Sequence, residues 1–258
     1  MGKNIALVYD ADFTLLDGYH PSVVLEEYKI NINDFWTKVG NTQKLEREKG
    51  DNTNVDIIYL AHFMYQIRYG KLKGLRIKDL KELGKEVDNM LYPGLPEFFY
   101  KIREKNPEHI ISHNIISVGI RDVLLGSIFG KYMNKIFGYT FFDDLTPGDG
   151  IDEIKGTTSS LEKFGAIIDI SYGGFKRDKY NFEFPIKDMI YFGDGSTDIG
   201  AFKFVRRKGG TAICVYDAGK EGAYEKALKL KDEVDYILPA DYREGSEIWN
   251  IVNNKINS

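Results

Sequence analysis

Short apolar runs that end in a polar residue recur along the chain. The runs are Asn4–Tyr9, His113–Ile116, Asp188–Phe192, Thr211–Tyr216 and Val234–Leu238. Each is four to six residues long, rich in β-branched and aromatic residues, and followed by Gly, Ser, Asp or Pro. This pattern is typical of buried strands in a parallel sheet. We therefore predict five strands.

Stretches with helical periodicity separate most of these runs. Apolar residues recur near the 3.6-residue period in 95–105, 119–129, 196–206 and 222–230. Strands that alternate with helices predict an α/β protein with a doubly wound, Rossmann-like parallel sheet. Ligands bind beyond the carboxyl ends of the strands in such sheets. The polar residues that end the runs are therefore expected to meet at one rim.

The segment after the first run breaks this alternation. Residues 17–92 contain no convincing strand, and their pattern predicts helices at 21–29, 34–39, 55–69 and 77–91. Pro21 suits a first helical turn, and Asn33 is expected to cap the second helix. About 75 residues is too long for a structureless loop. We predict a core of residues 1–16 and 93–258 interrupted by a helical cap of residues 17–92, and we interpret residues 139–183 as strands joined by turns.

Composition and charge narrow the class of protein. The 258 residues are 43% hydrophobic and 14% aromatic, which is enough for a core and excludes a disordered chain. A net charge of −4 does not favour nucleic acid or anionic lipid as a partner. Cys214 is the only cysteine, which excludes an intrachain disulfide and a Cys-rich zinc site. No apolar run approaches the ~20 residues of a membrane span, and no signal-peptide pattern begins the chain. We expect a cytoplasmic protein without a membrane partner.

Two carboxylates follow the first predicted strand. Asp10 and Asp12 stand two residues apart in the sequence DADFT. Such a pair can divide phosphate-ester chemistry between a nucleophile and a group that exchanges a proton with the leaving group. Acidic turns after strands are also common, so this pattern by itself leaves a purely structural turn open.

A second acidic turn follows the predicted strand 188–192. Asp194 and Asp198 lie in the sequence GDGSTD, in which the glycines let the backbone approach a ligand. Two carboxylates at such a turn suit Mg²⁺, which prefers oxygen ligands. Ser196 or Thr197 can also cap the following helix, with Asp198 favourable in its first turn. That interpretation leaves Asp194 unexplained.

Three segments of the chain resemble the motifs of a known family. VYDADFTLL, IISVG and IYFGDGSTDIGAF are similar to the first, second and fourth motifs of the haloacid dehalogenase-like (HAD) superfamily. The match covers residues 4–16, 110–120 and 188–204, and it is closest to the phosphatase branch with a phosphoserine-phosphatase-type helical cap. The cap itself and residues 139–183 are matched only loosely.

The resemblance implies a role for each matching residue. Asp10 would attack phosphorus to form an aspartyl-phosphate, and Asp12 would protonate the leaving alcohol and then activate water. Ser117 and Thr14 would bind the phosphoryl group. The implied Mg²⁺ site consists of Asp10, Asp12 (through its backbone carbonyl), Asp194 and Asp198.

The third motif of the family is a lysine, and here the chain departs from an easy match. Four lysines precede the fourth motif at plausible distances: Lys155, Lys163, Lys176 and Lys179. The stretch FKRDKYNFEF resembles the lysine-bearing segment of some members, which favours Lys179 and then Lys176. An exposed surface lysine is the alternative for each.

These residues predict a Mg²⁺-dependent phosphomonoesterase that acts on a small phosphorylated metabolite. A phosphotransferase or phosphomutase with the same intermediate is the main alternative. A non-catalytic binding module is disfavoured because it is expected to lack Asp10, Asp12 or Asp194. Phe35, Trp36 and the aromatic-rich segment Tyr59–Tyr69 are expected to pack the cap, and contact of one or two rings with the substrate is left open.

Overall fold

A computed structural model describes residues 2–174 and 183–258, and its centre is a seven-stranded sheet. The strands are β1 (Asn4–Tyr9), β2 (Ile110–Ile120), β3 (Lys135–Asp143), β4 (Ile151–Gly156), β5 (Met189–Gly193), β6 (Thr211–Tyr216) and β7 (Tyr236–Pro239). Their order is β4-β3-β2-β1-β5-β6-β7, and only the β3–β4 pair is antiparallel. The α/β fold predicted from the sequence is confirmed.

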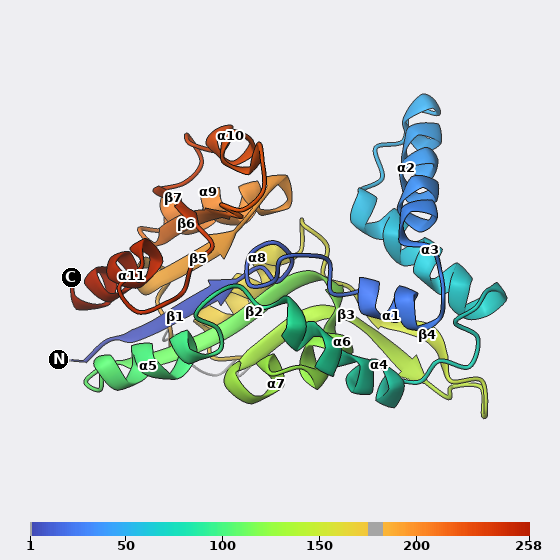
Figure 1. The fold of residues 1–258 in the computed structure, drawn as a ribbon, viewed down its shortest axis with the longest axis horizontal. Helices are drawn as coiled ribbons and strands as arrows, with labels where there is room; N and C mark the ends of the chain where they lie inside the picture. Colours follow the sequence, from blue (N-terminus) through green and yellow to red (C-terminus); the bar gives the residue numbers. More distant parts are fainter. Residues whose placement is uncertain (1, 175–182) are drawn as a thin grey trace.

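Helices cover both faces of the sheet (Figure 1). Side chains alternate along β1, so Leu7 and Tyr9 pack in one hydrophobic cluster while Ala6 and Val8 pack in the other. The first cluster takes in α5 (Glu97–Lys105), α6 (Arg121–Gly126), α7 (Phe129–Tyr132) and α11 (Glu247–Asn257). The second takes in α8 (Lys163–Ser171), α9 (Ile199–Arg207) and α10 (Ala223–Leu228). This arrangement buries β1 on both sides and places its carboxyl end at the middle of the rim.

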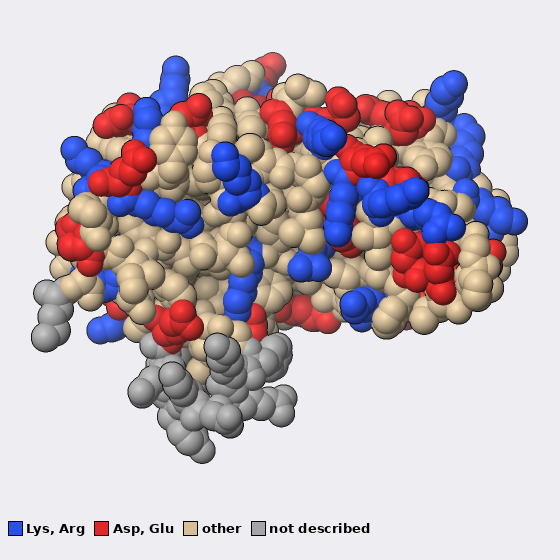
Figure 2. Space-filling view, turned by 90° about the horizontal axis from the view of Figure 1, so that it is seen from below, with Lys and Arg blue, Asp and Glu red and all other residues tan. Residues whose placement is uncertain are grey.

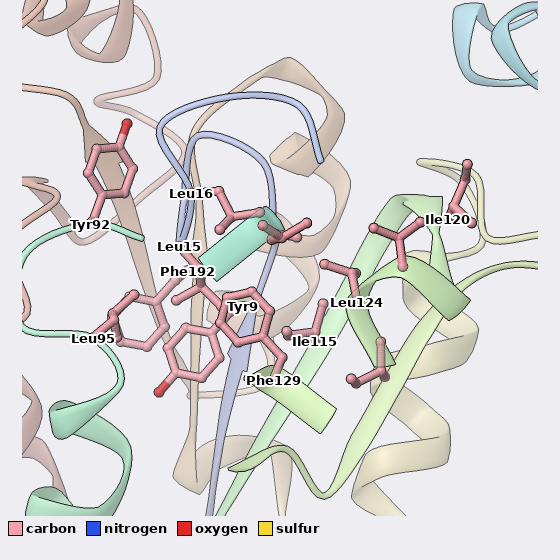
Figure 3. Close-up of a cluster of buried hydrophobic side chains, with 14 of the residues drawn as sticks. Tyr9, Leu15, Leu16, Tyr92, Leu95, Ile115, Ile120, Leu124, Phe129 and Phe192 are labelled. Carbon is pink, nitrogen blue, oxygen red and sulfur yellow. The ribbon is translucent and has the colours of Figure 1, made fainter. Parts of the chain in front are cut away.

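Aromatic packing supports β1 directly behind that rim. Tyr9 stacks on Phe192 of β5 with ring centroids 4.8 Å apart, and both rings belong to the cluster shown in Figure 3. The Tyr9 hydroxyl lies 3.0 Å from Nδ1 of His113, and Nε2 of that ring lies 3.0 Å from the carbonyl of Phe99. Because a carbonyl only accepts, Nε2 carries the proton and Nδ1 accepts from Tyr9. Burial lowers the pKa of His113 well below its usual value, so this histidine is neutral and structural.

The inserted segment leaves the core and returns to it at neighbouring positions. Leu16 and Leu91 form an antiparallel bridge, and the Tyr92 amide donates to the Leu15 carbonyl at 3.1 Å. Leu15, Leu16 and Tyr92 lie close together in Figure 3. Residues between these points can therefore fold without separating the strands of the core.

The insertion contains α1 (Ser22–Glu27), α2 (Ile32–Glu48), α3 (Val55–Tyr69), α4 (Ile77–Leu83) and the 3₁₀ helix η1 (Gly84–Met90). The predicted bounds of α3 are correct, but the prediction that Asn33 caps α2 is wrong. Asn31 is the N-cap, and its side chain accepts a hydrogen bond from the Asp34 amide at 2.9 Å. Asn33 lies inside the first turn of the helix, which also extends well beyond Val39.

The helices of the insertion divide into two groups. Helix α4 and η1 pack closely on α6, where a Cβ at Gly126 would overlap the carbonyl of Lys81. Helices α2 and α3 instead project away from the sheet as a pair (Figure 1). Helix α3 touches the β3–β4 hairpin, where Arg68 pairs with Glu153 at 2.9 Å. The part of the insertion that stands over the rim is therefore α2 and α3.

The interpretation of residues 139–183 as strands joined by turns is correct for the β3–β4 hairpin and wrong for the helix that follows it. The segment holds the end of β3, all of β4 and the helix α8, which the sequence analysis missed. The Ile residues of α8 favour strand by intrinsic propensity, but Ile167 and Ile170 are buried against the sheet at helical spacing. Strand β2 also continues through Ile120, beyond its predicted end. In α8, packing overrides local preference.

Acidic and basic side chains are interspersed on the face shown in Figure 2, and neither sign forms a broad patch there. Among residues 2–174 and 183–258, no helix combines the length and the apolar character needed to cross a bilayer.

The close contact between α4 and α6 predicts a stability effect. Gly126→Ala is expected to lower the free energy of unfolding by about 1–3 kcal/mol, because the methyl group has no space beside the Lys81 carbonyl. Gly40→Ala is the matched control: nothing lies within 4 Å of its added Cβ, in the interior of α2. It is expected to stabilise by about 0.5–1 kcal/mol. Urea denaturation measures both, and equal effects would contradict the packing argument.

Candidate active site

A cavity of about 270 Å³ lies between the carboxyl rim of the sheet and the projecting helices. Asp10 and Asp12 line it from the loop after β1, and Asp194 lines it from the loop after β5. Trp36 of α2 and Tyr59 of α3 line the opposite side. The sequence-distant acidic motifs therefore meet at one cavity, as the strand ends predict.

Asp10 is held at the centre of the rim. Its amide donates to the Phe192 carbonyl at 2.8 Å, which continues the β1–β5 pairing by one residue. Asp10 is 5% exposed, and Oδ1 of its carboxylate accepts from Nζ of Lys163 at 2.9 Å. No described residue donates a hydrogen bond to the other oxygen, Oδ2. Burial raises the pKa of Asp10, Lys163 opposes this, and the neighbouring carboxylates reinforce it.

Lys163 begins α8 and is fully buried beneath the cavity. Its Nζ donates to Asp198 Oδ1 at 2.6 Å as well as to Asp10. Burial alone lowers the pKa of a lysine, but Asp10 and Asp198 outweigh that effect and raise the pKa of Lys163 well above its usual value. The side chain is therefore a fixed positive charge between two carboxylates.

Asp198 is entirely occupied by protein donors. Its Oδ1 also accepts from the Tyr191 hydroxyl at 2.7 Å, and its Oδ2 accepts from the amides of Asp194 and Gly195 at 3.3 and 3.4 Å. A Cβ at Gly193 would overlap this carboxylate, which explains the glycine at that position. Asp198 thus orients Lys163 and the loop that carries Asp194.

Asp194 contributes a carboxylate that is open to the cavity. Burial and then the charge of Asp198 raise its pKa to about 7, although Lys226 lies 3.6 Å from its Oδ2. One oxygen each of Asp10, Asp194 and Asp198 lie within 4.8 Å of one another. Crowded oxygen ligands of this kind are the donor set that a hard divalent cation prefers.

Asp12 is oriented by a histidine that the sequence analysis did not single out. The amide and Nδ1 of His20 lie 2.8 and 2.7 Å from Asp12 Oδ1, and the Ile120 amide donates to His20 Nε2 at 2.9 Å. Since an amide only donates, Nε2 accepts and Nδ1 carries the proton that is given to Asp12. His20 is fully buried and links the insertion, the loop after β1 and the end of β2.

Backbone strain accompanies this arrangement. Phe13, next to Asp12, has φ of 56°, in the left-handed region that residues other than glycine rarely adopt. Such conformations persist where surrounding structure holds them and are concentrated at functional sites. The turn directs the ring of Phe13 to the cavity, where it contacts Tyr19 edge-on at 4.7 Å.

Ser117 and Thr14 are buried beside the cavity and are not among its lining residues. Ser117 Oγ accepts from the Gly119 amide at 3.0 Å, which leaves its own proton to donate. The Thr14 hydroxyl has no hydrogen-bond partner among the described residues, while its carbonyl accepts from the Tyr242 hydroxyl at 2.8 Å. Their roles toward a phosphoryl group remain predictions.

The four candidate lysines differ in their surroundings or in whether the structure describes them. Lys163 contacts the acidic cluster, Lys155 is exposed near the Phe142 ring, and Lys176 and Lys179 lie outside the described residues. Of the candidates that the structure describes, Lys163 is the one in contact with Asp10 and Asp198. A signal for this lysine was present, because Lys163 stands in a predominantly apolar stretch, where a solvated lysine is not expected. Nothing in the local sequence pointed to His20.

Comparison with known proteins defines the class of fold. No model of a protein family matches the chain. An uncharacterized protein of Borreliella burgdorferi is 26% identical over 278 residues, covering 98% of this chain and 96% of that protein. A substrate-bound phosphoserine phosphatase superposes with a TM-score of 0.58 at 17% identity, covering 95% of this chain and 97% of the other. A HAD family hydrolase from Salmonella enterica serovar Typhi gives 0.62 at 17% identity, covering 92% and 68%. The chain therefore has the fold of the HAD-like phosphatases, as its motifs imply.

The buried position of Lys163 predicts a large effect on stability. Lys163→Met leaves two buried carboxylates without their counterion and is expected to lower the free energy of unfolding by about 3–5 kcal/mol. The exposed Lys155→Met is the control and is expected to change it by less than about 1 kcal/mol. Chemical denaturation at neutral pH gives both values. Similar losses in the two variants would contradict the assignment of Lys163 as the central cation.

Proposed function

We propose that the protein is a Mg²⁺-dependent phosphomonoesterase that forms an aspartyl-phosphate on Asp10. The observation that carries this proposal is the state of the Asp10 carboxylate. One of its oxygens is fixed by Lys163, and the other has no protein donor among the described residues, at a cavity that Asp10 lines. A carboxylate held in this way is oriented for nucleophilic attack.

The acidic cluster fits a magnesium ion. Asp10, Asp194 and the backbone carbonyl of Asp12 would hold it, with Asp198 as support, because the oxygens of Asp198 already accept hydrogen bonds. Burial, reinforced by the neighbouring carboxylates, raises the pKa values of Asp10 and Asp194. When bound, Mg²⁺ would neutralise charge on the phosphoryl oxygens.

In the first half of the reaction, an oxygen of Asp10 bonds to phosphorus as the bond from phosphorus to the substrate alcohol breaks. Asp12 gives its proton to the leaving oxygen, and His20 holds the Asp12 carboxyl in place for this transfer. Lys163 balances the charge of Asp10 and of the phosphoryl group. The hydroxyl of Ser117 donates to a phosphoryl oxygen.

In the second half, a water molecule attacks phosphorus of the aspartyl-phosphate. Asp12, now ionised, takes a proton from this water, and the bond from phosphorus to Asp10 breaks. Inorganic phosphate leaves and both carboxyl groups return to their starting states. Helices α2 and α3 cover the cavity and would exclude bulk water during these steps.

Removal of the nucleophile or of the metal tests this proposal. The purified protein with Mg²⁺ is expected to release inorganic phosphate from small phosphate esters, and EDTA is expected to abolish the release until Mg²⁺ is restored. Asp10→Asn keeps the side-chain volume but removes the nucleophile, and a loss in kcat of at least about 10³-fold is expected. Phosphate release that persists in Asp10→Asn would overturn the mechanism.

The role of Asp12 predicts a dependence on the leaving group. Asp12→Asn is expected to lower kcat for alkyl phosphates by roughly 10²–10⁴-fold. The loss should be smaller for p-nitrophenyl phosphate, whose leaving group departs without a proton. His20→Ala removes the side-chain hydrogen bond to Asp12. It should also lower kcat more for alkyl phosphates than for p-nitrophenyl phosphate, but each loss should be smaller than in Asp12→Asn, and KM should change little. Equal losses for both substrates would indicate a structural effect only.

A further inference from the structure

Aromatic rings form one continuous wall of the cavity. The rings of Tyr19 and Trp36 are 5.0 Å apart between centroids, and Trp36 stacks on Tyr59 at 5.3 Å and 22°. Phe13 continues the wall through its edge-on contact with Tyr19. Three of these rings come from the insertion and one comes from the loop after β1. The wall is therefore shared by the two halves of the molecule that enclose the cavity.

A carboxylate of the insertion lies at the same cavity. Asp56, in the first turn of α3, is 5% exposed and lines the cavity. Its Oδ2 accepts hydrogen bonds from the amide and the hydroxyl of Ser160. No lysine, arginine or histidine of the described residues pairs with it. Its negative charge at the cavity is therefore stabilised by hydrogen bonds and not by a cation.

The tyrosine beside Asp56 adds a free acceptor. The Tyr59 hydroxyl is buried and has no hydrogen-bond partner among the described residues. Burial raises the pKa of this hydroxyl well above its usual value, so the group stays neutral. This hydroxyl can accept a hydrogen bond from a ligand or donate one, and the buried Nε1–H of Trp36, which also has no partner among the described residues, can only donate.

Basic side chains are nearly absent from the lining of the cavity. Among the described residues that line it, Lys226 is the one lysine or arginine, and its Nζ is 3.6 Å from Asp194. At the Phe13 end of the wall, Lys220 lies over the ring at 5.2 Å, but it does not line the cavity and pairs with Asp217 at 3.3 Å. Near Asp56 and Tyr59, a carboxylate on the alcohol portion of a substrate would find no lysine or arginine among the described lining residues. Such a substrate would instead place that carboxylate near Asp56, which is unfavourable.

We propose that the substrate is a phosphate ester whose alcohol carries a positively charged amine and no carboxylate. The ammonium group would lie between the aromatic wall and Asp56, while the phosphoryl group lies at Asp10. Ring faces attract cations, and a carboxylate in a water-poor site strengthens that preference. A quaternary ammonium would use the rings, and a primary ammonium would also donate to Asp56 and Tyr59. This inference rests on the proposed phosphatase function and specifies its substrate class.

Two pairs of esters that differ only in charge test the proposal. Phosphocholine is compared with 3,3-dimethylbutyl phosphate, and O-phosphoethanolamine with n-propyl phosphate. In at least one pair, kcat/KM for the cationic ester is expected to exceed that of its neutral partner by about tenfold or more. The pair with the larger ratio shows whether the site prefers a quaternary or a primary ammonium. O-Phosphoserine and cytidine monophosphate are included as competitors of other classes.

A substitution in the cap assigns the preference to Asp56. Asp56→Asn keeps an acceptor for Ser160 but removes the charge. The ratio of kcat/KM for the cationic ester to kcat/KM for its neutral partner is therefore expected to fall toward one in the preferred pair. Glu48→Gln is the matched control, because it removes an exposed carboxylate from α2 outside the cavity. That variant should keep the wild-type ratio. Thermal unfolding of both variants shows that each one is folded.

Several outcomes would overturn the inference and leave the phosphatase intact. The first is a ratio of kcat/KM near one in both pairs. The second is a higher kcat/KM for O-phosphoserine or cytidine monophosphate than for the cationic esters. The third is an equal loss of kcat/KM for both members of a pair in Asp56→Asn. Calorimetric measurement of the binding of the same pairs to Asp10→Asn distinguishes a failure of the cation site from a failure of the phosphatase mechanism. If no ester is hydrolysed but the cationic esters still bind more tightly, the reaction is wrong and the cation site stands. If binding also shows no preference, the cation site is wrong.

Discussion

The ion pair network around Lys163 is the constraint on which the rest of the site depends. Transfer of one ammonium and two carboxylates out of water costs several kcal/mol per ion, and this cost is offset only when every charge is paired and hydrogen-bonded. Lys163 comes from α8, Asp10 from the end of β1 and Asp198 from the loop after β5. These three elements must therefore be in register before the network can form, and the network then holds the rim of the sheet in one arrangement.

The network also explains the division of labour among the acids. Both oxygens of Asp198 accept hydrogen bonds, from Lys163, Tyr191 and two backbone amides. Asp198 therefore positions Lys163 and the loop that carries Asp194. Asp10 keeps one oxygen free, and Asp194 faces the cavity with a raised pKa. Asp12 stands apart because it is bound by His20 and not by Lys163. Four carboxylates of similar sequence context thus acquire different chemistry from their neighbours.

The insertion couples this site to its surroundings in two ways. Its α4 and η1 pack on α6 and fix the segment to the core, while α2 and α3 project over the rim. His20 lies in the first turn of the chain after it leaves the core, and it contacts both Asp12 and the end of β2. The same segment therefore supplies a wall to the cavity and a support to the proposed acid.

Much of this was determined by the sequence alone, because the signals were local. The bounds of β1, β6 and α3 follow from local apolar patterns, and the meeting of Asp10 and Asp194 at one cavity follows from the rule for parallel strands. Helix α8 was missed because its β-branched residues resemble a strand until they are packed. The apolar stretch around Lys163 was a weak signal, and the contact of this lysine with Asp10 and Asp198 was decided by the tertiary structure. A lysine becomes a central cation when folding buries it among carboxylates that are distant in the sequence. The local sequence around the lysine does not indicate which carboxylates these are. The same holds for His20 and Asp56, whose partners come from other parts of the chain.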